Sequence, residues 1–131
     1  MMKDWQAALV LFMTMAAISL LPHCAQAADK WSSRDIGLEI TYQVLNVVDA
    51  GQTAAIGDSP HYHEVGMARP FLGNNPSEVG SAAYFAATGL LHVGITHLLP
   101  SKWRPVWQGV TITVQGANVL RNHAIGLRWG F

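Results

Sequence analysis

The residues best suited to chemistry in this sequence of 131 residues lie close together in the segment His61-Tyr62-His63-Glu64. Imidazole nitrogen and carboxylate oxygen are common ligands of zinc and copper, and Asp49 could supply a further ligand. The spacing lacks the helical geometry of an H-E-x-x-H motif. We therefore expect no cofactor, with a zinc or copper site at His61, His63, Glu64 and Asp49 as the alternative.

Two acids, Glu39 and Asp49, lie in otherwise apolar segments. If such a segment lies in a membrane, an ionisable group within it is a functional candidate. We expect Asp49 to pair with Arg121 or His92 and so to join helices, and the alternative is a catalytic role. The polar side chains that we expect to be buried are Glu39, Asp49, Gln52, His92, Gln115, Asn118, Asn122 and Arg121.

The sequence contains no serine nucleophile elbow, phosphate-binding loop or paired cysteine and histidine motif. His92 and His97 are five residues apart, which is about 140° around a helix, so both cannot face one site. No catalytic residue is identified, and the sequence favours a protein without chemistry of its own.

Helices must position these side chains, and the first is expected over residues 33–57. Ser32 or Ser33 can act as N-cap, and the helix dipole favours Asp35 in the first turn. Polar side chains spaced by three or four residues fall on one face of this helix. They are Glu39, Gln43, Asn46, Asp49 and Thr53.

Two further helices are expected after an irregular loop over residues 58–75. The second covers 76–99, with Asn75 as N-cap and Pro76 at its first position. The third covers 102–121, and the short link predicts an antiparallel hairpin of the second and third helices. Both carry polar stripes at helical spacing: Tyr84, Thr88, His92 and Thr96, then Gln108, Thr111, Gln115, Asn118 and Asn122.

Charge is absent from long stretches of the second and third helices: residues 79–101 and 105–120 contain no Asp, Glu, Lys or Arg. Surface helices of soluble proteins normally carry charges on their outer face. The second helix is long enough to cross a bilayer, where the polar stripes would turn inward. The positive-inside rule places Lys102 and Arg104 in the cytoplasm, with helix 33–57 at the outer interface or re-entrant. The alternative is a soluble periplasmic bundle.

The first 27 residues resemble a secretory signal, with Lys3, an apolar run over 7–21 and Ala25-Gln26-Ala27 as a cleavage site. Residues 28–131 then form a single helical domain. Cleavage would remove Cys24, the only cysteine; lipidation at Cys24 and a retained anchor are alternatives. Eight basic and eight acidic residues give no net charge, which argues against nucleic-acid binding.

The last nine residues, 123–131, alternate between apolar and other residues and end in Phe, as the closing strand of an outer-membrane β-barrel does. A barrel needs at least about eight such strands, whereas the rest of the chain has helical periodicity. A small outer-membrane barrel is therefore the second alternative.

A set of short motifs is spread over most of the chain after residue 27: Asp49-x-x-Gln52-Thr53, Leu72-Gly73-x-x-Pro76-Ser77, Tyr84-Phe85, Leu99-Pro100 and Trp103-Arg104. In these the sequence resembles small exported or membrane proteins of unknown function from bacteria. The resemblance implies no reaction or ligand. After Glu64 this sequence departs from the family's pattern, since Val-Gly-Met-Ala-Arg-Pro stands where a shorter Asn-Pro is expected.

The sequence thus predicts an all-α fold: a signal peptide and a three-helix, membrane-associated bundle of the bacterial cell envelope. We expect it in the inner membrane facing the periplasm. Its partners would be membrane lipid and another envelope protein or a second copy. Its role would be structural or one of partner interaction.

Overall fold

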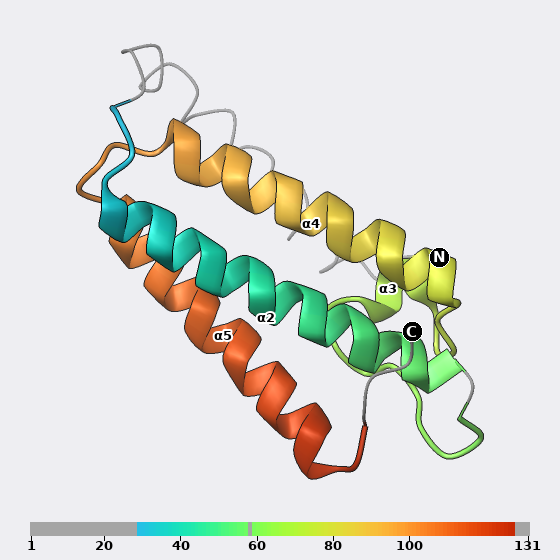
Figure 1. Ribbon diagram of the computed structural model, residues 1–131. Coiled ribbons are helices and arrows are strands. Elements are labelled where there is room, and N and C mark those ends of the chain that lie inside the picture. Colours follow the sequence, from blue (N-terminus) through green and yellow to red (C-terminus); the bar gives the residue numbers. More distant parts are fainter. Residues whose placement is uncertain (1–28, 58, 128–131) are drawn as a thin grey trace, which may run out of the picture.

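The computed structural model describes residues 29–57 and 59–127, and within them the chain forms four helices and no strand. In chain order these are α2 (Ser33–Gly57), α3 (Arg69–Leu72), α4 (Glu78–Leu98) and α5 (Arg104–Ala124) (Figure 1). The all-α prediction is confirmed for this part of the chain. The predicted signal peptide, with Cys24, lies outside the described residues.

Helix α2 begins and ends where the sequence predicts, and its first turn explains why. The Ser32 hydroxyl accepts a hydrogen bond from the Asp35 backbone N–H at 3.1 Å. The Ser32 backbone N–H in turn donates to Asp35 Oδ2 at 3.0 Å. This reciprocal capping box satisfies two backbone donors, with Asp35 in the place usually taken by Glu or Gln. Ser32, not Ser33, is therefore the N-cap.

Helix α4 begins later than predicted, because its N-cap is Ser77 and not Asn75. The Ser77 side chain accepts from the Gly80 backbone N–H at 3.0 Å. The helix ends before Leu99, whose extended backbone is the conformation that the following Pro100 demands. Helix α5 begins at Arg104 and continues three residues beyond the predicted end at residue 121, until Gly126 adopts a positive φ of 90°.

Helix α2 holds the bundle together. Figure 1 shows it antiparallel to α4 and parallel to α5, and both of these helices pack mainly on α2. Helices α4 and α5 are antiparallel, as predicted, but they contact each other little. The predicted hairpin is therefore splayed, because each of its helices buries its polar stripe against α2.

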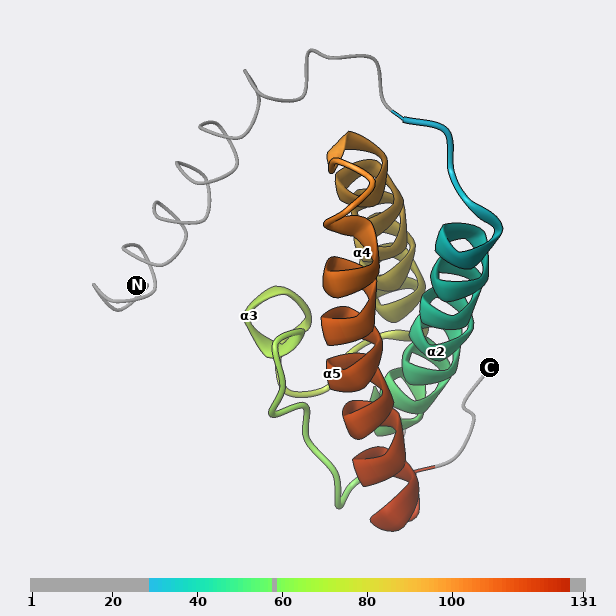
Figure 2. The same cartoon turned by 90° about the vertical axis from the view of Figure 1, so that its left-hand side faces the viewer.

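The segment between α2 and α4 packs against both helices that it connects. Figure 2 shows α3 at the side of the bundle, where it packs against α4. The ring of Phe71 lies 5.5 Å from that of Tyr84. The segment returns to the end of α2 so closely that a Cβ at Gly57 would collide with the Pro76 carbonyl. This position therefore requires glycine.

The described part of the C-terminal segment, up to residue 127, contains no strand, although a barrel strand was the alternative. His123 and Ala124 belong to α5, a turn follows, and residues 128–131 lie outside the described part. The helices and the lack of strands in the described residues make the β-barrel alternative wrong for that part of the chain.

The interior of the bundle is mainly polar and its outer surface mainly apolar. Buried polar residues outnumber buried apolar ones among the described residues, and they include Asp35, Glu39, His92, Arg104 and Gln108. Large apolar side chains point outward on all three long helices: Ile36, Ile40, Val44 and Val47; Val79, Leu90 and Leu91; Val106, Val110 and Val114. This is the reverse of the pattern in a soluble protein.

Candidate functional site

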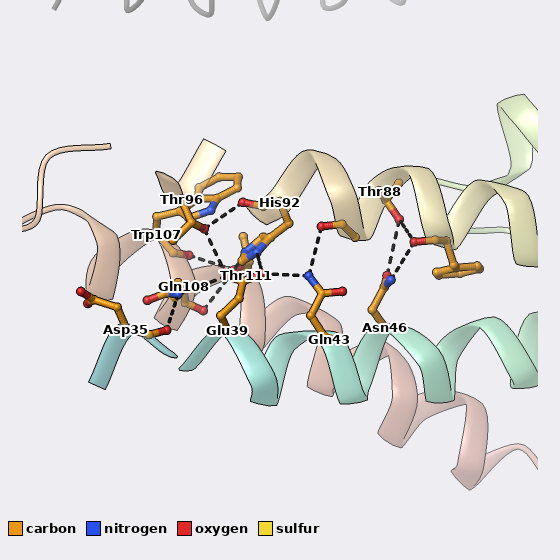
Figure 3. Close-up of polar contacts among 12 residues, drawn as sticks. Asp35, Glu39, Gln43, Asn46, Thr88, His92, Thr96, Trp107, Gln108 and Thr111 are labelled. Carbon is orange, nitrogen blue, oxygen red and sulfur yellow. Dashed lines mark hydrogen bonds and ion pairs between the residues drawn. The ribbon is translucent and has the colours of Figure 1, made fainter. Parts of the chain in front are cut away.

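Glu39 of α2 is the centre of the largest buried polar cluster (Figure 3). Its Oε1 atom accepts from Gln43 Nε2 at 2.8 Å and lies 2.9 Å from His92 Nδ1. Its Oε2 atom accepts from Thr96 Oγ1 at 3.2 Å and from Gln108 Nε2 at 3.1 Å. All three long helices therefore supply groups to one carboxyl group that is only 6% exposed.

His92 of α4 is enclosed on every side. Its ring stacks on Tyr42, with centroids 3.5 Å apart and planes 10° from parallel, and on Trp107 at 5.3 Å. Its Nδ1 atom faces Glu39, and its Nε2 atom lies 2.8 Å from Thr111 Oγ1. The result is a row of carboxylate, imidazole and hydroxyl groups that crosses from α2 through α4 to α5 (Figure 3).

An ion pair lies one turn away from Glu39, between Asp35 and Arg104. Arg104 Nη1 is 3.9 Å from Asp35 Oδ2, and both side chains are buried. Gln108 links this pair to Glu39, since its Nε2 atom also donates to the Asp35 backbone carbonyl at 2.9 Å. The Asp35–Arg104 ion pair, the Glu39–His92 contact and the Gln108 amide between them form one network at the N-terminal ends of α2 and α5.

The middle of the α2–α4 contact is polar but uncharged. Gln43 Nε2 donates to the Gly89 carbonyl at 3.0 Å, and Asn46 Nδ2 donates to the Phe85 carbonyl at 2.8 Å. Gly89 makes this approach possible, because a Cβ there would lie 2.7 Å from Gln43 Oε1. These amide contacts hold α4 against α2 along the row that begins at Glu39.

Asp49 is the centre of a smaller cluster at the opposite end of α2. Its two oxygens accept from Gln115 Nε2 at 2.8 Å and from Asn122 Nδ2 at 2.9 Å. Gln52, also buried, donates to the Val119 carbonyl at 3.3 Å. The predicted pairing of Asp49 with Arg121 or His92 is therefore wrong: His92 pairs with Glu39, and amides of α5 bind Asp49.

The eight polar residues that the sequence predicts to be buried differ in how far the structure buries them. Glu39, Asp49, Gln52 and His92 are buried, whereas Gln115 and Asn122 are half-buried. Two residues differ from the prediction, because Asn118 and Arg121 are exposed. Asn122, next along the helix from Arg121, takes the place expected for the arginine.

The predicted metal ligands do not form a cluster in the described part of the chain. No group of three or more His, Cys, Asp or Glu residues there is arranged to hold a metal ion. His61 and His63 are exposed. Glu64 is nearly buried and accepts from the Gly66 backbone N–H at 2.6 Å, while Asp49 is bonded to α5.

Sequence reasoning missed the structural importance of Asp35 and Arg104. Asp35 was interpreted only as a helix-end residue, and Arg104 only as a charge in the link between helices. The signal available for Arg104 was its position directly before an uncharged stretch, residues 105–120. Thr96, Thr111 and Gln108 were placed correctly in polar stripes but were not named as site residues.

No protein-family model matches this chain, and no curated protein or solved structure matches it either. The site must therefore be interpreted from its own geometry. That geometry provides buried groups that can hold a proton and join three helices. The described residues around Glu39 and His92 are so closely packed that they leave the pair almost no contact with solvent.

Proposed function

We propose that the protein is an integral membrane protein of the bacterial cell envelope and that α2, α4 and α5 lie side by side in the bilayer. Its role in this proposal is structural: it packs with partner proteins or with a second copy and carries out no reaction. The observation behind the proposal is the reversed distribution of polar and apolar side chains over the three helices.

The outer faces of the helices support a lipid environment. Ile40 on α2 and Val110 on α5 are each 58% exposed, and Leu90 on α4 is 75% exposed. In water, so much exposed apolar surface around a polar interior would oppose folding. In lipid the same surface meets hydrocarbon, and the polar groups satisfy one another inside the bundle.

Length and composition alone select only one membrane span in the described residues, namely α4. Helices α2 and α5 do not meet this criterion, because the mean hydropathy of a helical segment includes the buried polar residues as well as the exposed apolar ones. Their outward faces are apolar, and α2 lies along both other helices (Figure 1). The proposal therefore places α2 at the same depth as α4 and α5, instead of at the membrane interface.

Aromatic and charged residues gather where α4 joins α5, which fits a membrane boundary. Trp31 donates to His97 Nδ1 at 3.3 Å, and Trp103 is 54% exposed in the link. Asp29 accepts from the Ser101 backbone N–H at 3.3 Å, and hydrogen bonding from Ser101 lowers the pKa of Asp29. Tryptophan and charged groups of this kind favour the headgroup region.

Fractionation tests this proposal directly. The full chain is expressed in bacteria, and the membranes are washed with alkaline carbonate, which releases peripheral proteins. We expect the protein to stay in the pellet and to enter solution only with detergent. Recovery of the folded protein in the soluble fraction would contradict the proposal. A soluble periplasmic protein and a known membrane protein serve as controls.

A further inference from the structure

The negative charge of Glu39 has no counter-charge near it unless His92 is cationic. The titratable side chains that enclose the cluster are Asp35, Glu39 and Tyr42 from α2, His92 from α4 and Arg104 from α5. Arg104 is 3.9 Å from Asp35. The hydrogen bonds that the Arg104 guanidinium donates all go to backbone carbonyls. Glu39 therefore depends on His92 for a counter-charge.

The neighbouring amides fix Glu39 as an ionised acceptor. Gln43 Nε2 lies within hydrogen-bonding distance of two acceptors, Glu39 Oε1 and the Gly89 carbonyl. Gln108 Nε2 lies in the same way between Glu39 Oε2 and the Asp35 carbonyl. Turning either amide around would set its oxygen against both acceptors. Both oxygens of Glu39 thus face donors, and a carboxylate suits this arrangement better than a carboxylic acid.

The surroundings of His92 complete the argument. A cationic ring donates from Nδ1 to Glu39 and from Nε2 to Thr111 Oγ1. The Thr111 hydroxyl can then donate to the carbonyl of Trp107 or Gln108, each 3.0 Å away. The faces of Tyr42 and Trp107, stacked on the two sides of the ring, also favour a cation between them.

We propose that Glu39 and His92 form a buried proton-binding site, in which His92 holds the bound proton as an imidazolium at neutral pH. The neutral ring could also complete its hydrogen bonds, but it would leave the Glu39 charge unbalanced among three helices, which is strongly unfavourable. Loss of the proton removes the ion pair between α2 and α4.

Nitrogen-15 NMR of the histidine rings tests the site in the full chain, purified in detergent micelles at pH 7. We expect two protonated ring nitrogens for His92, whose signal is assigned from its loss in His92→Gln or, if that variant does not fold, by elimination with substitutions of the other histidines. A neutral His92 ring, with either nitrogen unprotonated, would overturn the proposal. His97, which is exposed, provides the internal comparison.

A matched pair of substitutions links the proton to its carboxylate. Glu39→Gln removes the counter-charge, and we expect His92 to lose its second ring proton at pH 7. Asp49→Asn removes the other buried acid of α2, and we expect His92 to keep both protons. A His92 ring that stays cationic in folded Glu39→Gln would contradict the pairing; if that variant does not fold, the wild-type spectrum decides. Both measurements use solubilised protein, so a failed membrane proposal would not affect them.

Discussion

At the scale of single residues, Arg104 shows most directly how a buried charge can organise chain ends. Its Nε atom donates to the carbonyls of Thr96 and Leu99, both at 3.0 Å. Its Nη1 and Nη2 atoms donate to the carbonyls of Lys30 and His97 at 3.4 and 3.3 Å. A cation suits the end of α4, where helix carbonyls lack partners and the dipole is negative. One side chain therefore joins the end of α4, the start of α5 and the segment before α2.

Replacing Arg104 tests this role. Arg104→Ala leaves Asp35 without its buried counter-charge and several buried carbonyls without a donor, so we expect it to lower the free energy of unfolding by about 3–5 kcal/mol. Lys102→Ala, an exposed position in the same link, should change it by less than about 0.5 kcal/mol. The measurement is unfolding in mixed detergent micelles followed by circular dichroism. Equal effects of the two substitutions would show that Arg104 does not hold these chain ends.

At the scale of elements, substitutions of two neighbouring serines test which residue is the N-cap of α2. Ser32→Ala removes the hydroxyl that accepts from the Asp35 N–H, so we expect a loss of about 1 kcal/mol. Ser33→Ala changes an exposed residue inside the helix and should be neutral or slightly stabilising, since alanine favours helix. The same unfolding measurement compares them. A larger effect at Ser33 would place the N-cap one residue later.

The contact between α4 and α2 depends on Gly89 of α4 but not on Gly94 of the same helix. A Cβ at Gly89 would lie 2.7 Å from Gln43 Oε1 and 3.1 Å from Asn46 Nδ2, whereas at Gly94 nothing lies within 4 Å. We expect Gly89→Val to destabilise the bundle by about 1–3 kcal/mol through overpacking. Gly94→Val should have little effect. If Gly94→Val were the more harmful, α4 would have to face α2 with its other side.

The sequence predicted the helices well and their packing less well, for physical reasons that particular residues make clear. The α2 limits followed from local signals, namely the capping residues and Gly57. The start of α4 did not, because Asn75 and Ser77 are both residue types that cap helices well, and the structure uses Ser77. The short link correctly predicted that α4 and α5 are antiparallel, but it could not show that each packs mainly on α2.

The candidate site was predictable to a similar extent. Polar residues at helical spacing identified Glu39 and His92 as buried, but the sequence could not pair them, because their contact depends on the relative positions of α2 and α4. Arg121 and Asn122 are neighbours about 100° apart on a helix, so which of them faces Asp49 depends on how α5 is rotated about its axis. The structure puts Asn122 toward Asp49 and leaves Arg121 outside.

At the scale of the whole molecule, the uncharged stretches of the sequence correspond to uncharged outer faces of the three long helices. The sequence shows that α4 after its first residue, Glu78, and most of α5 lack Asp, Glu, Lys and Arg. The structure adds that the three acids of α2, Asp35, Glu39 and Asp49, all turn inward. From residue 36 to residue 57 the outer face of α2 is therefore as free of charge as the outer faces of the other two helices.

One substitution on this surface gives opposite outcomes in water and in lipid. Val110 lies on the outer face of α5, about two turns from the N-terminus of that helix. In a soluble protein, Val110→Lys would place a charge in water and would be neutral or improve solubility. In a bilayer a lysine costs up to about 2.5–3.5 kcal/mol, the value for the centre of a spanning helix, so we expect less protein in membranes and a lower free energy of unfolding. The control is Val65→Lys, at a position also exposed but in the segment between α2 and α3. We expect that variant to accumulate as wild type does, and equal accumulation of both variants would contradict contact between α5 and lipid.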